Sequence, residues 1–309
     1  MTTQAFTGVM SPVLTPFDND LKPNGRKLAA FCKQLLAEGC TSLSPFGTNS
    51  EANSMSVEER IDLLDQIIDS GIDPKKLMPG TGSCALSDAV RASKHATQRG
   101  CGGVMVLPPF YYKNMTDDGF YRFFAEMIQR VGDAKMKIYL YHIPPQTVQG
   151  ISLDLIERLI KAYPTTVVGI KDSSGDWKNT SGMLERFQPQ GFDVFAGSET
   201  FLLANMRGGG AGCITATGNV NPGPIVKLYK EWKSADADAQ QATLDITRAA
   251  FAKYPMIPAM KAAIAWKAGR KDWGTVRPPL VELGPEQQVG LQQALDAAGF
   301  ELPNAQALA

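Results

Sequence analysis

The chain is poor in the residues that usually hold a metal. It has two histidines, His95 and His142, and its five cysteines include no Cys-x-x-Cys pair. A catalytic metal centre normally draws on several such ligands, so the sequence predicts no bound metal. The odd number and wide spacing of the cysteines also argue against a disulfide framework, and we expect buried thiols instead.

Net charge and long apolar runs are absent as well. Lys plus Arg and Asp plus Glu each number 31, so no global field favours nucleic acid or an anionic membrane. No apolar run approaches the length of a membrane helix, and MTTQAFTGVMSPVLTPF lacks the basic start and apolar core of a signal peptide. We expect a cytoplasmic protein that acts on a small molecule and binds neither nucleic acid nor membrane.

What the sequence does contain is a repeated alternation of strand-like runs and segments with helical periodicity. Eight such units follow one another, which predicts parallel strands with helical crossovers and therefore an α/β (β/α)8 TIM barrel over residues 1–234. An open doubly wound sheet is the main alternative, but it requires a Gly-rich turn after the first strand, and SPVLTPFDND has none. The strands are expected at 7–14, 40–46, 77–82, 102–110, 136–144, 167–172, 192–197 and 211–217.

The last part of the chain has a different pattern. Residues 235–309 contain two apolar helical stretches, ATLDITRAAFAKY and PAMKAAIAWKAG, and no strand-like run follows them. We expect a C-terminal helical extension that packs on the barrel. Within the barrel, Ser56 and Glu59 have the spacing of a capping box, which predicts a helix that begins there and stops at Gly71.

One stretch places a lysine at the end of a branched apolar run. In VVGIKDSSGDW, at 167–177, the first residues favour a strand and the last favour a turn, so Lys171 is expected at a strand end. On this stretch alone, a solvated or ion-paired lysine is the commoner explanation, because most lysines lie on the surface. The alternative is a desolvated amine that attacks a carbonyl to form a Schiff base.

Barrel enzymes build their sites from the loops at the C-terminal strand ends, so the residues at these ends help to decide between the two explanations for Lys171. Lys171 would form an iminium with a 2-oxo acid, and Tyr141 would move the proton that the reaction requires. The turn Gly47-Thr48-Asn49 can aim N–H groups and a hydroxyl at the carboxylate of such an acid. Further pocket-lining residues are expected at Gln146, Ser173, Gly197, Ser198, Glu199 and Ile214.

Each of these residues also has a simpler explanation. A single tyrosine, such as Tyr112 or Tyr141, is more often a core or interface aromatic than a catalyst. Thr48 and Asn49 are common turn formers. His142 is expected to be a hydrogen-bonded structural residue rather than a base.

Five segments at the strand ends carry a family resemblance. In content and in order they resemble the dihydrodipicolinate synthase/N-acetylneuraminate lyase family of class I aldolases. PMIPAMKAAIAWKAG and VRPPLVEL are similar to the C-terminal helical region of that family. The five segments are GTNSE (47–51), PPFYYK (108–113), YHIPPQT (141–147), GIKDSSGD (169–176) and AGSETFLL (196–203).

The resemblance implies a role for several residues. Lys171 would be the Schiff-base lysine, Tyr141 the proton shuttle, and Thr48 with Asn49 the turn that binds the substrate carboxylate. Tyr112 matches a tyrosine that family members contribute across a subunit interface, which implies a homodimer or a tetramer built of such dimers. No cofactor is implied beyond the covalent imine between lysine and substrate.

Three departures from the family pattern bear on the substrate. Gln146 occupies the position where the synthases carry an arginine for the carboxylate of the aldehyde partner, and a neutral amide cannot form that charged pair. Ser50 replaces the glycine of the GTTGE motif and is expected to tighten the turn unless its backbone avoids positive φ. Ser198-Glu199-Thr200 stands where sialic-acid lyases carry an Asp-Glu pair for polyol hydroxyls.

Four hypotheses follow for the function. The first is a lyase, or aldolase, that acts on pyruvate or a 2-keto-3-deoxy or hydroxy-oxo acid. The second is a dehydratase of a sugar-derived 2-keto-3-deoxy acid that uses the same iminium. The third, disfavoured by Gln146, is a 4-hydroxy-tetrahydrodipicolinate synthase that joins pyruvate to aspartate semialdehyde. The fourth is a non-catalytic barrel that binds a small carboxylate, because fold does not establish function.

Overall fold

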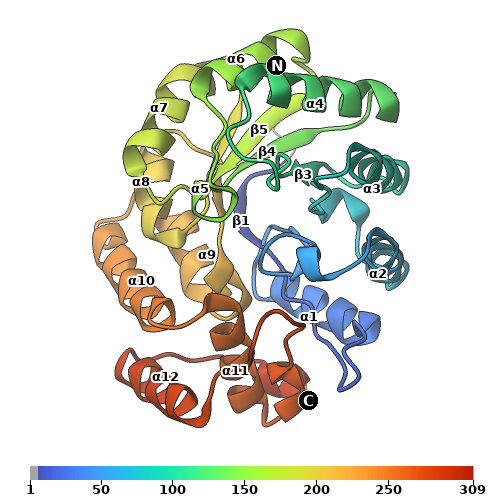
Figure 1. Cartoon of the computed structure of the whole chain (residues 1–309). Coiled ribbons are helices and arrows are strands. Elements are labelled where there is room, and N and C mark those ends of the chain that lie inside the picture. The colour runs from blue at the N-terminus through green and yellow to red at the C-terminus, as the bar shows by residue number, and fades with distance from the viewer. Residues whose placement is uncertain (1–5, 309) are drawn as a thin grey trace.

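A parallel sheet curls around the centre of the molecule and is surrounded by helices (Figure 1). The structure is a computed structural model that describes residues 6–308. Residues 1–5 and 309, at the outer ends of the two predicted regions, lie outside the described residues.

The strand order identifies the sheet as a barrel. The hydrogen-bonded order is β2-β1-β7-β6-β5-β4-β3, and all neighbours are parallel. Neighbours in the sheet are neighbours in the sequence, apart from the β1–β7 pair that joins first to last, so the order has no reversal of the kind that a doubly wound sheet requires. The strands are β1 (Gly8–Ser11), β2 (Ser42–Leu43), β3 (Val104–Val106), β4 (Ile138–His142), β5 (Val167–Asp172), β6 (Asp193–Ala196) and β7 (Gly212–Ile214).

The segment predicted as the third strand, residues 77–82, closes the ring between β2 and β3 without being a regular strand. It forms single parallel bridges, Leu43 with Leu77 and Gly80 with Met105. Pro79 lacks an N–H, which interrupts the ladder. A side chain at position 80 would place its Cβ 2.2 Å from the Phe46 carbonyl oxygen, so only glycine allows this close approach. The eight predicted strand positions are thus all occupied by extended chain.

The helices follow the predicted units closely. Ser56 and Glu59 form the predicted capping box at the start of α2, and Gly71 follows its end with φ at 97°. Two helices were not predicted. α5 is a single turn, and α12 buries only Leu291 and Leu295, so its hydrophobic periodicity in the sequence is weak. The helices are α1 (Gly25–Ala37), α2 (Val57–Asp69), α3 (Leu86–Gln98), α4 (Asp117–Val131), α5 (Pro144–Thr147), α6 (Leu153–Ala162), α7 (Trp177–Phe187), α8 (Leu202–Arg207), α9 (Pro222–Glu231), α10 (Ala237–Ala252), α11 (Met256–Ala268) and α12 (Pro285–Ala297).

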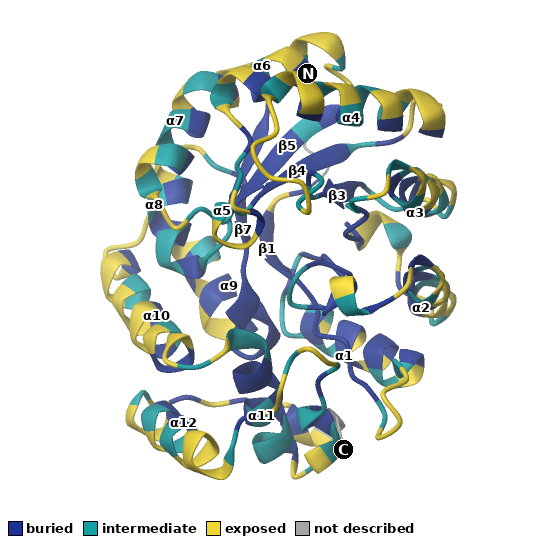
Figure 2. Cartoon of the chain, viewed as in Figure 1, coloured by how far each residue is buried: buried dark blue, intermediate teal, exposed yellow. Residues whose placement is uncertain are grey.

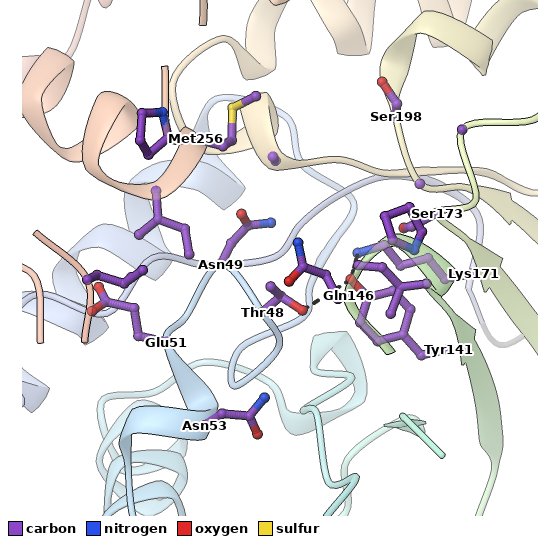
Figure 3. Close-up of a pocket in the computed structure, with 18 of the residues that line it drawn as sticks. Thr48, Asn49, Glu51, Asn53, Tyr141, Gln146, Lys171, Ser173, Ser198 and Met256 are labelled. Carbon is purple, nitrogen blue, oxygen red and sulfur yellow. Dashed lines mark hydrogen bonds between the residues drawn. The ribbon is translucent and has the colours of Figure 1, made fainter. Parts of the chain in front are cut away.

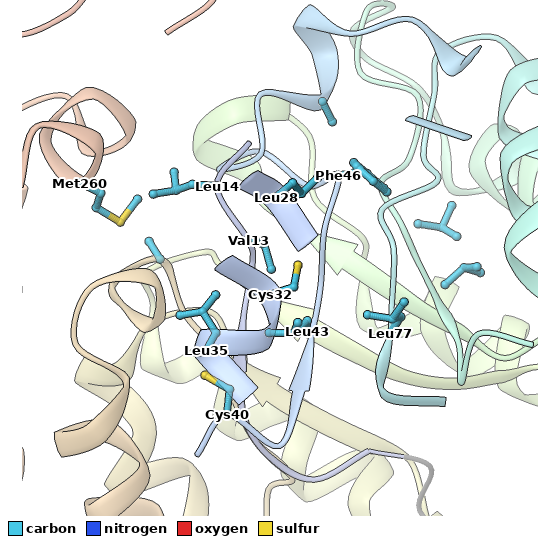
Figure 4. Packing of buried hydrophobic residues seen from close by; sticks show 14 of the residues in the cluster. Val13, Leu14, Leu28, Cys32, Leu35, Cys40, Leu43, Phe46, Leu77 and Met260 are labelled. Atoms are coloured by element: carbon cyan, nitrogen blue, oxygen red, sulfur yellow. The ribbon is translucent and has the colours of Figure 1, made fainter. Parts of the chain in front are cut away.

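The main core lies between the strands and the inner faces of the helices, as the burial pattern in Figure 2 shows. Leu28, Cys32 and Leu35 of α1 belong to this core, together with Leu43 of β2 and Leu77 (Figure 4). Burying one leucine side chain contributes about 1.5–3 kcal/mol, so these helix–strand layers supply the dominant stabilising energy.

The cysteines only partly match the expectation of buried thiols. Cys32, Cys40 and Cys213 are buried, whereas Cys84 and Cys101 are half-buried, and all five are free. Burial raises the pKa of the Cys40 thiol to about 12, so that thiol stays protonated at neutral pH. No helix in the described part of the chain is long and apolar enough to span a bilayer.

The C-terminal extension is anchored to the barrel by a buried ion pair. Lys261 of α11 and Glu51, at the end of the turn after β2, form this pair with both side chains fully buried. The Lys261 amine also donates to the Thr275 carbonyl 2.7 Å away, and the Arg277 N–H donates to the Glu51 carboxylate at 2.7 Å. The turn that carries Thr48 is therefore held from behind by the extension.

We expect Lys261→Met to lower the free energy of unfolding by about 3–5 kcal/mol, because Glu51 would remain as a buried charge without its partner. Urea denaturation measures the change, with Lys253→Met, at an exposed position after α10, as the matched control. Adding Glu51→Gln to Lys261→Met should recover part of the loss. Equal stability of the Lys253 and Lys261 variants would contradict this account.

Candidate active site

A cavity of about 740 Å³ opens at the C-terminal ends of the strands (Figure 3). Its walls come from both parts of the chain, with Lys171 on the barrel side and Met256 of α11 on the opposite side. The barrel contributes Thr48, Asn49, Tyr141, Gln146, Lys171, Ser173, Gly197 and Ser198, and the extension contributes Arg248, Met256, Pro279 and Leu280.

Lys171 and Tyr141 are brought together by the register of two neighbouring strands. They are directly opposite one another in the β4–β5 pair, so both side chains project toward the same side of the sheet. The Lys171 amine lies 3.4 Å from the Tyr141 hydroxyl and 4.4 Å from the centre of its ring. Lys171 is 2% exposed and forms no ion pair with any residue from 6 to 308, which excludes the solvated or ion-paired explanation.

Thr48 extends this contact into a chain of three polar groups. Its hydroxyl lies 3.4 Å from the Tyr141 hydroxyl, and either oxygen can be the donor. Figure 3 shows the three side chains converging, with Asn49 next to Thr48. The phenol is thus positioned between the amine and the turn that the sequence assigned to carboxylate binding.

The turn itself accommodates Ser50 without strain. Positive φ falls on the next residue, Glu51, at 58°, and Ser50 does not adopt it. The buried Ser50 hydroxyl donates to the Val13 carbonyl, and the Thr15 hydroxyl donates to the Ser50 carbonyl at 2.8 Å. The expected tightening of the turn therefore does not arise, and the serine adds a hydrogen bond that glycine could not form.

The loop after Lys171 is fixed by a buried carboxylate. Asp172 accepts hydrogen bonds from the Ser174 N–H at 2.9 Å, the Asn179 amide at 3.1 Å and the Thr180 hydroxyl at 2.6 Å. With its carboxylate bound in this way, Asp172 holds the loop after β5 to the start of α7.

His142 has the structural role that the sequence predicted. Its Nδ1 accepts a hydrogen bond from the Ile151 N–H at 2.9 Å. Burial lowers the pKa of His142, although nearby Asp172 opposes the shift, so the ring is neutral at pH 7. His142 does not line the cavity among the described residues.

Gly197 and Ser173 form a close contact in the cavity wall. A Cβ at position 197 would lie 2.1 Å from the Ser173 hydroxyl oxygen and 2.5 Å from the Asp172 carbonyl oxygen, so glycine is required there. Ser198, next in the chain, accepts a hydrogen bond from the Thr200 hydroxyl at 2.9 Å. Ser173 and Gly197 therefore shape the wall beside Lys171.

Three predicted pocket residues lie outside the lining of this cavity. Tyr112, predicted to act across a subunit interface, is 68% exposed on the loop after β3. Ile214 is fully buried in the barrel core. Glu199 is 1% exposed behind the cavity wall, where its carboxylate accepts hydrogen bonds from the hydroxyls of Thr215 and Thr217. Gly47 lines a small neighbouring cavity of about 20 Å³.

The extension supplies residues that the sequence analysis missed. Arg248, Met256 and Pro279 line the cavity although they follow β7 by more than 30 positions in the chain. Met256 and Pro279 belong to the two segments that resemble the family's C-terminal region, but nothing local marks any of the three as a cavity residue, because only the packing of α10 and α11 on the barrel brings them to its mouth. Within residues 6–308, no group of three or more His, Cys, Asp or Glu side chains is arranged to hold a metal ion.

Comparison with known proteins agrees with this geometry. A model of the dihydrodipicolinate synthetase family matches residues 5–298. The chain belongs to the dihydrodipicolinate synthetase family. Its closed ring of parallel strands is accordingly the (β/α)8 barrel of that family, as predicted.

Several family members are similar over nearly their whole length. An uncharacterised DapA-like lyase of Chloroflexus aurantiacus is 32% identical over 94% of this chain and 96% of its own. The 4-hydroxy-tetrahydrodipicolinate synthase of Bacillus subtilis is 28% identical, with 94% and 98% covered. Among solved structures, dihydrodipicolinate synthase from Agrobacterium tumefaciens has a TM-score of 0.88 at 29% identity, covering 94% of this chain and 99% of that one. YagE from E. coli K12, solved in complex with pyruvate, has a TM-score of 0.87 at 26% identity, covering 96% and 99%.

Proposed function

We propose that this protein is a class I lyase that cleaves or forms the carbon–carbon bond next to the methyl carbon of pyruvate, through an iminium on Lys171. The observation that carries the proposal is the buried Lys171 amine, free of an ion pair in the described part of the chain and within 3.4 Å of the Tyr141 hydroxyl. The pyruvate bound to the relative YagE supports the choice of a 2-oxo acid.

In the first step the Lys171 amine attacks the carbonyl carbon of the 2-oxo acid. Water leaves, and a protonated imine replaces the carbonyl. The positive nitrogen then accepts the electron pair released when the bond to the methyl-derived carbon breaks, or stabilises the enamine that forms this bond in the reverse direction. No metal is part of the proposed mechanism, since the lysine itself provides the electron sink.

The turn after β2 is suited to hold the substrate carboxylate. The backbone N–H groups of Thr48 and Asn49 have no hydrogen-bond partner within residues 6–308. Both residues line the cavity, and the Thr48 hydroxyl lies beside them. Two N–H donors and a hydroxyl can bind one carboxylate and orient its neighbouring carbonyl toward Lys171.

Tyr141 is the proposed proton carrier. Its hydroxyl lies 3.4 Å from both the Lys171 amine and the Thr48 hydroxyl. A phenol in this position can take a proton from the attacking amine and return it to the departing hydroxyl of the carbinolamine. It can also serve the substrate hydroxyl whose proton is lost on cleavage.

An oligomer is part of the proposal, supported by the exposed aromatic loop after β3. Tyr111 and Tyr112 are 73% and 68% exposed and lie edge to face, with ring centres 5.4 Å apart. Large aromatic side chains left in solvent are typical of subunit contacts.

We expect pyruvate and borohydride together to modify Lys171 irreversibly, because hydride reduces the imine to a stable secondary amine. Mass spectrometry of proteolytic fragments locates the adduct. Lys171→Arg should abolish it, whereas Lys178→Arg, at an exposed position in the next helix, should leave it unchanged. If no 2-oxo acid yields an adduct in the wild-type protein, the proposal fails and a non-catalytic barrel becomes the better explanation.

Turnover of a substrate panel distinguishes the remaining alternatives. A lyase releases pyruvate from 4-hydroxy-2-oxo acids, whereas a dehydratase converts 2-keto-3-deoxy acids without releasing it. A synthase consumes pyruvate only with aspartate semialdehyde. The neutral Gln146 in the cavity wall favours the first outcome over the third.

We expect Tyr141→Phe to slow exchange of the pyruvate methyl protons with deuterated solvent by about 10²- to 10⁴-fold, because the proton carrier is lost. Nuclear magnetic resonance of the methyl signal measures the rate. Tyr139→Phe is the matched control, since it removes a phenol on the same strand that is hydrogen-bonded to Asp193 outside the cavity lining. Comparable rates in the two variants would show that Tyr141 does not carry the proton.

A further inference from the structure

A second cation, Arg248, enters the cavity from the extension. It lies on α10, its side chain is 22% exposed, and it lines the same cavity as Lys171. Among the described residues that line this cavity, Lys171 and Arg248 are the cationic ones. When the Lys171 amine is bonded to the substrate as the imine, Arg248 is the other cationic side chain in the cavity that can bind an anionic group.

The guanidinium is held in place through one of its nitrogens, Nη1. Its Nη1 lies 3.2 Å from the Glu199 carboxylate and 3.5 Å from the Thr215 hydroxyl. Glu199 already accepts hydrogen bonds from the hydroxyls of Thr215 and Thr217, one on each carboxylate oxygen. Each carboxylate oxygen thus has a hydroxyl donor besides Arg248, and the ion pair with Glu199 holds Nη1 of the guanidinium in place.

Most of the hydrogen-bonding capacity of Arg248 is unused. A guanidinium has five N–H donors, yet Nε and Nη2 of Arg248 have no partner within residues 6–308. Arg277 shows how a structural arginine differs in this protein. Its Nε donates to the Leu21 carbonyl, and its two terminal nitrogens bind Glu59 along with the carbonyls of Ser54 and Leu21.

The acids in the cavity wall do not offset Arg248. Glu51 is bound by Lys261 and the Arg277 N–H, and Asp172 is bound by Asn179 and Thr180. Neither carboxylate forms an ion pair with Arg248. Nε and Nη2 of Arg248, which lines the cavity, are thus left without a partner within residues 6–308, while Nη1 is paired with Glu199.

We propose that Arg248 binds a carboxylate at the far end of the substrate, so that the enzyme acts on 2-oxo acids with a carboxylate at each end. The inference rests on the proposed function, because it takes the near end of the substrate to be the imine on Lys171. Glu199 is the positioning residue, because it holds the Arg248 guanidinium toward the cavity. A singly charged, planar carboxylate fits better than a phosphate, because Glu199 offsets part of the positive charge.

The test compares two 2-oxo acids of equal length, 2-oxoglutarate and 2-oxopentanoate, which differ at the far end by a carboxylate and a methyl group. The concentration of each that gives half-maximal borohydride trapping is measured, with pyruvate as a third ligand. In the wild-type protein, 2-oxoglutarate should trap at the lower concentration. Arg248→Gln should raise that concentration by about 10- to 100-fold, the loss expected for a charged hydrogen bond, and leave the values for 2-oxopentanoate and pyruvate within about 3-fold.

Two further variants separate binding from a structural effect. Glu199→Gln should weaken only 2-oxoglutarate, whereas Arg207→Gln, which removes an exposed ion pair with Asp238, should change none of the three values. Equal loss for all three ligands in Arg248→Gln, or no preference for 2-oxoglutarate in the wild-type protein, would overturn this inference while leaving the iminium intact. Absence of any pyruvate adduct would instead refute the proposed function and the inference with it.

Discussion

The buried ion pair between Glu51 and Lys261 is the constraint on which the site depends. Both side chains are fully buried, so separating them would expose each to an uncompensated desolvation cost. Glu51 ends the turn that begins with Thr48 and Asn49, and Lys261 lies on α11, whose first residues line the cavity. The pair therefore fixes the distance between the two walls of the cavity. A barrel without its extension would lose the support of the turn as well as one wall.

Parallel pairing supplies the other half of the site. Because β4 and β5 are in parallel register, Tyr141 and Lys171 occupy opposite positions and their polar ends meet without help from a loop. Groups on strands are held more rigidly than groups on loops, which suits an amine and a proton carrier that must stay in contact. The residues proposed to select a substrate lie instead on α5, on the loop after β6 and on α10, which are elements that can vary without disturbing the sheet.

Much of this arrangement could be predicted from the sequence, for identifiable reasons. Alternating strand and helix patterns are local, so the sequence could predict the barrel, the capping box of α2 and the position of Lys171 at a strand end. It could not predict which side chains point into the cavity. Glu199 follows a strand as a pocket residue would, yet it is turned behind the wall by Thr215 and Thr217. Arg248 carries no local signal, and only tertiary packing brings it to the cavity. The weak hydrophobic pattern of α12 hid that helix, whereas the third strand position was predicted but forms only single bridges around Pro79.

The central claim is that Lys171 and the Thr48–Asn49 turn bind the two ends of one 2-oxo acid group. A crystal structure of the protein after reduction with borohydride in pyruvate tests it most directly. The account predicts a covalent bond from the Lys171 Nζ to the central carbon of the adduct, with the adduct carboxylate on the backbone N–H groups of Thr48 and Asn49. A bond to another lysine, or a carboxylate turned away from the turn toward Arg248, would contradict it.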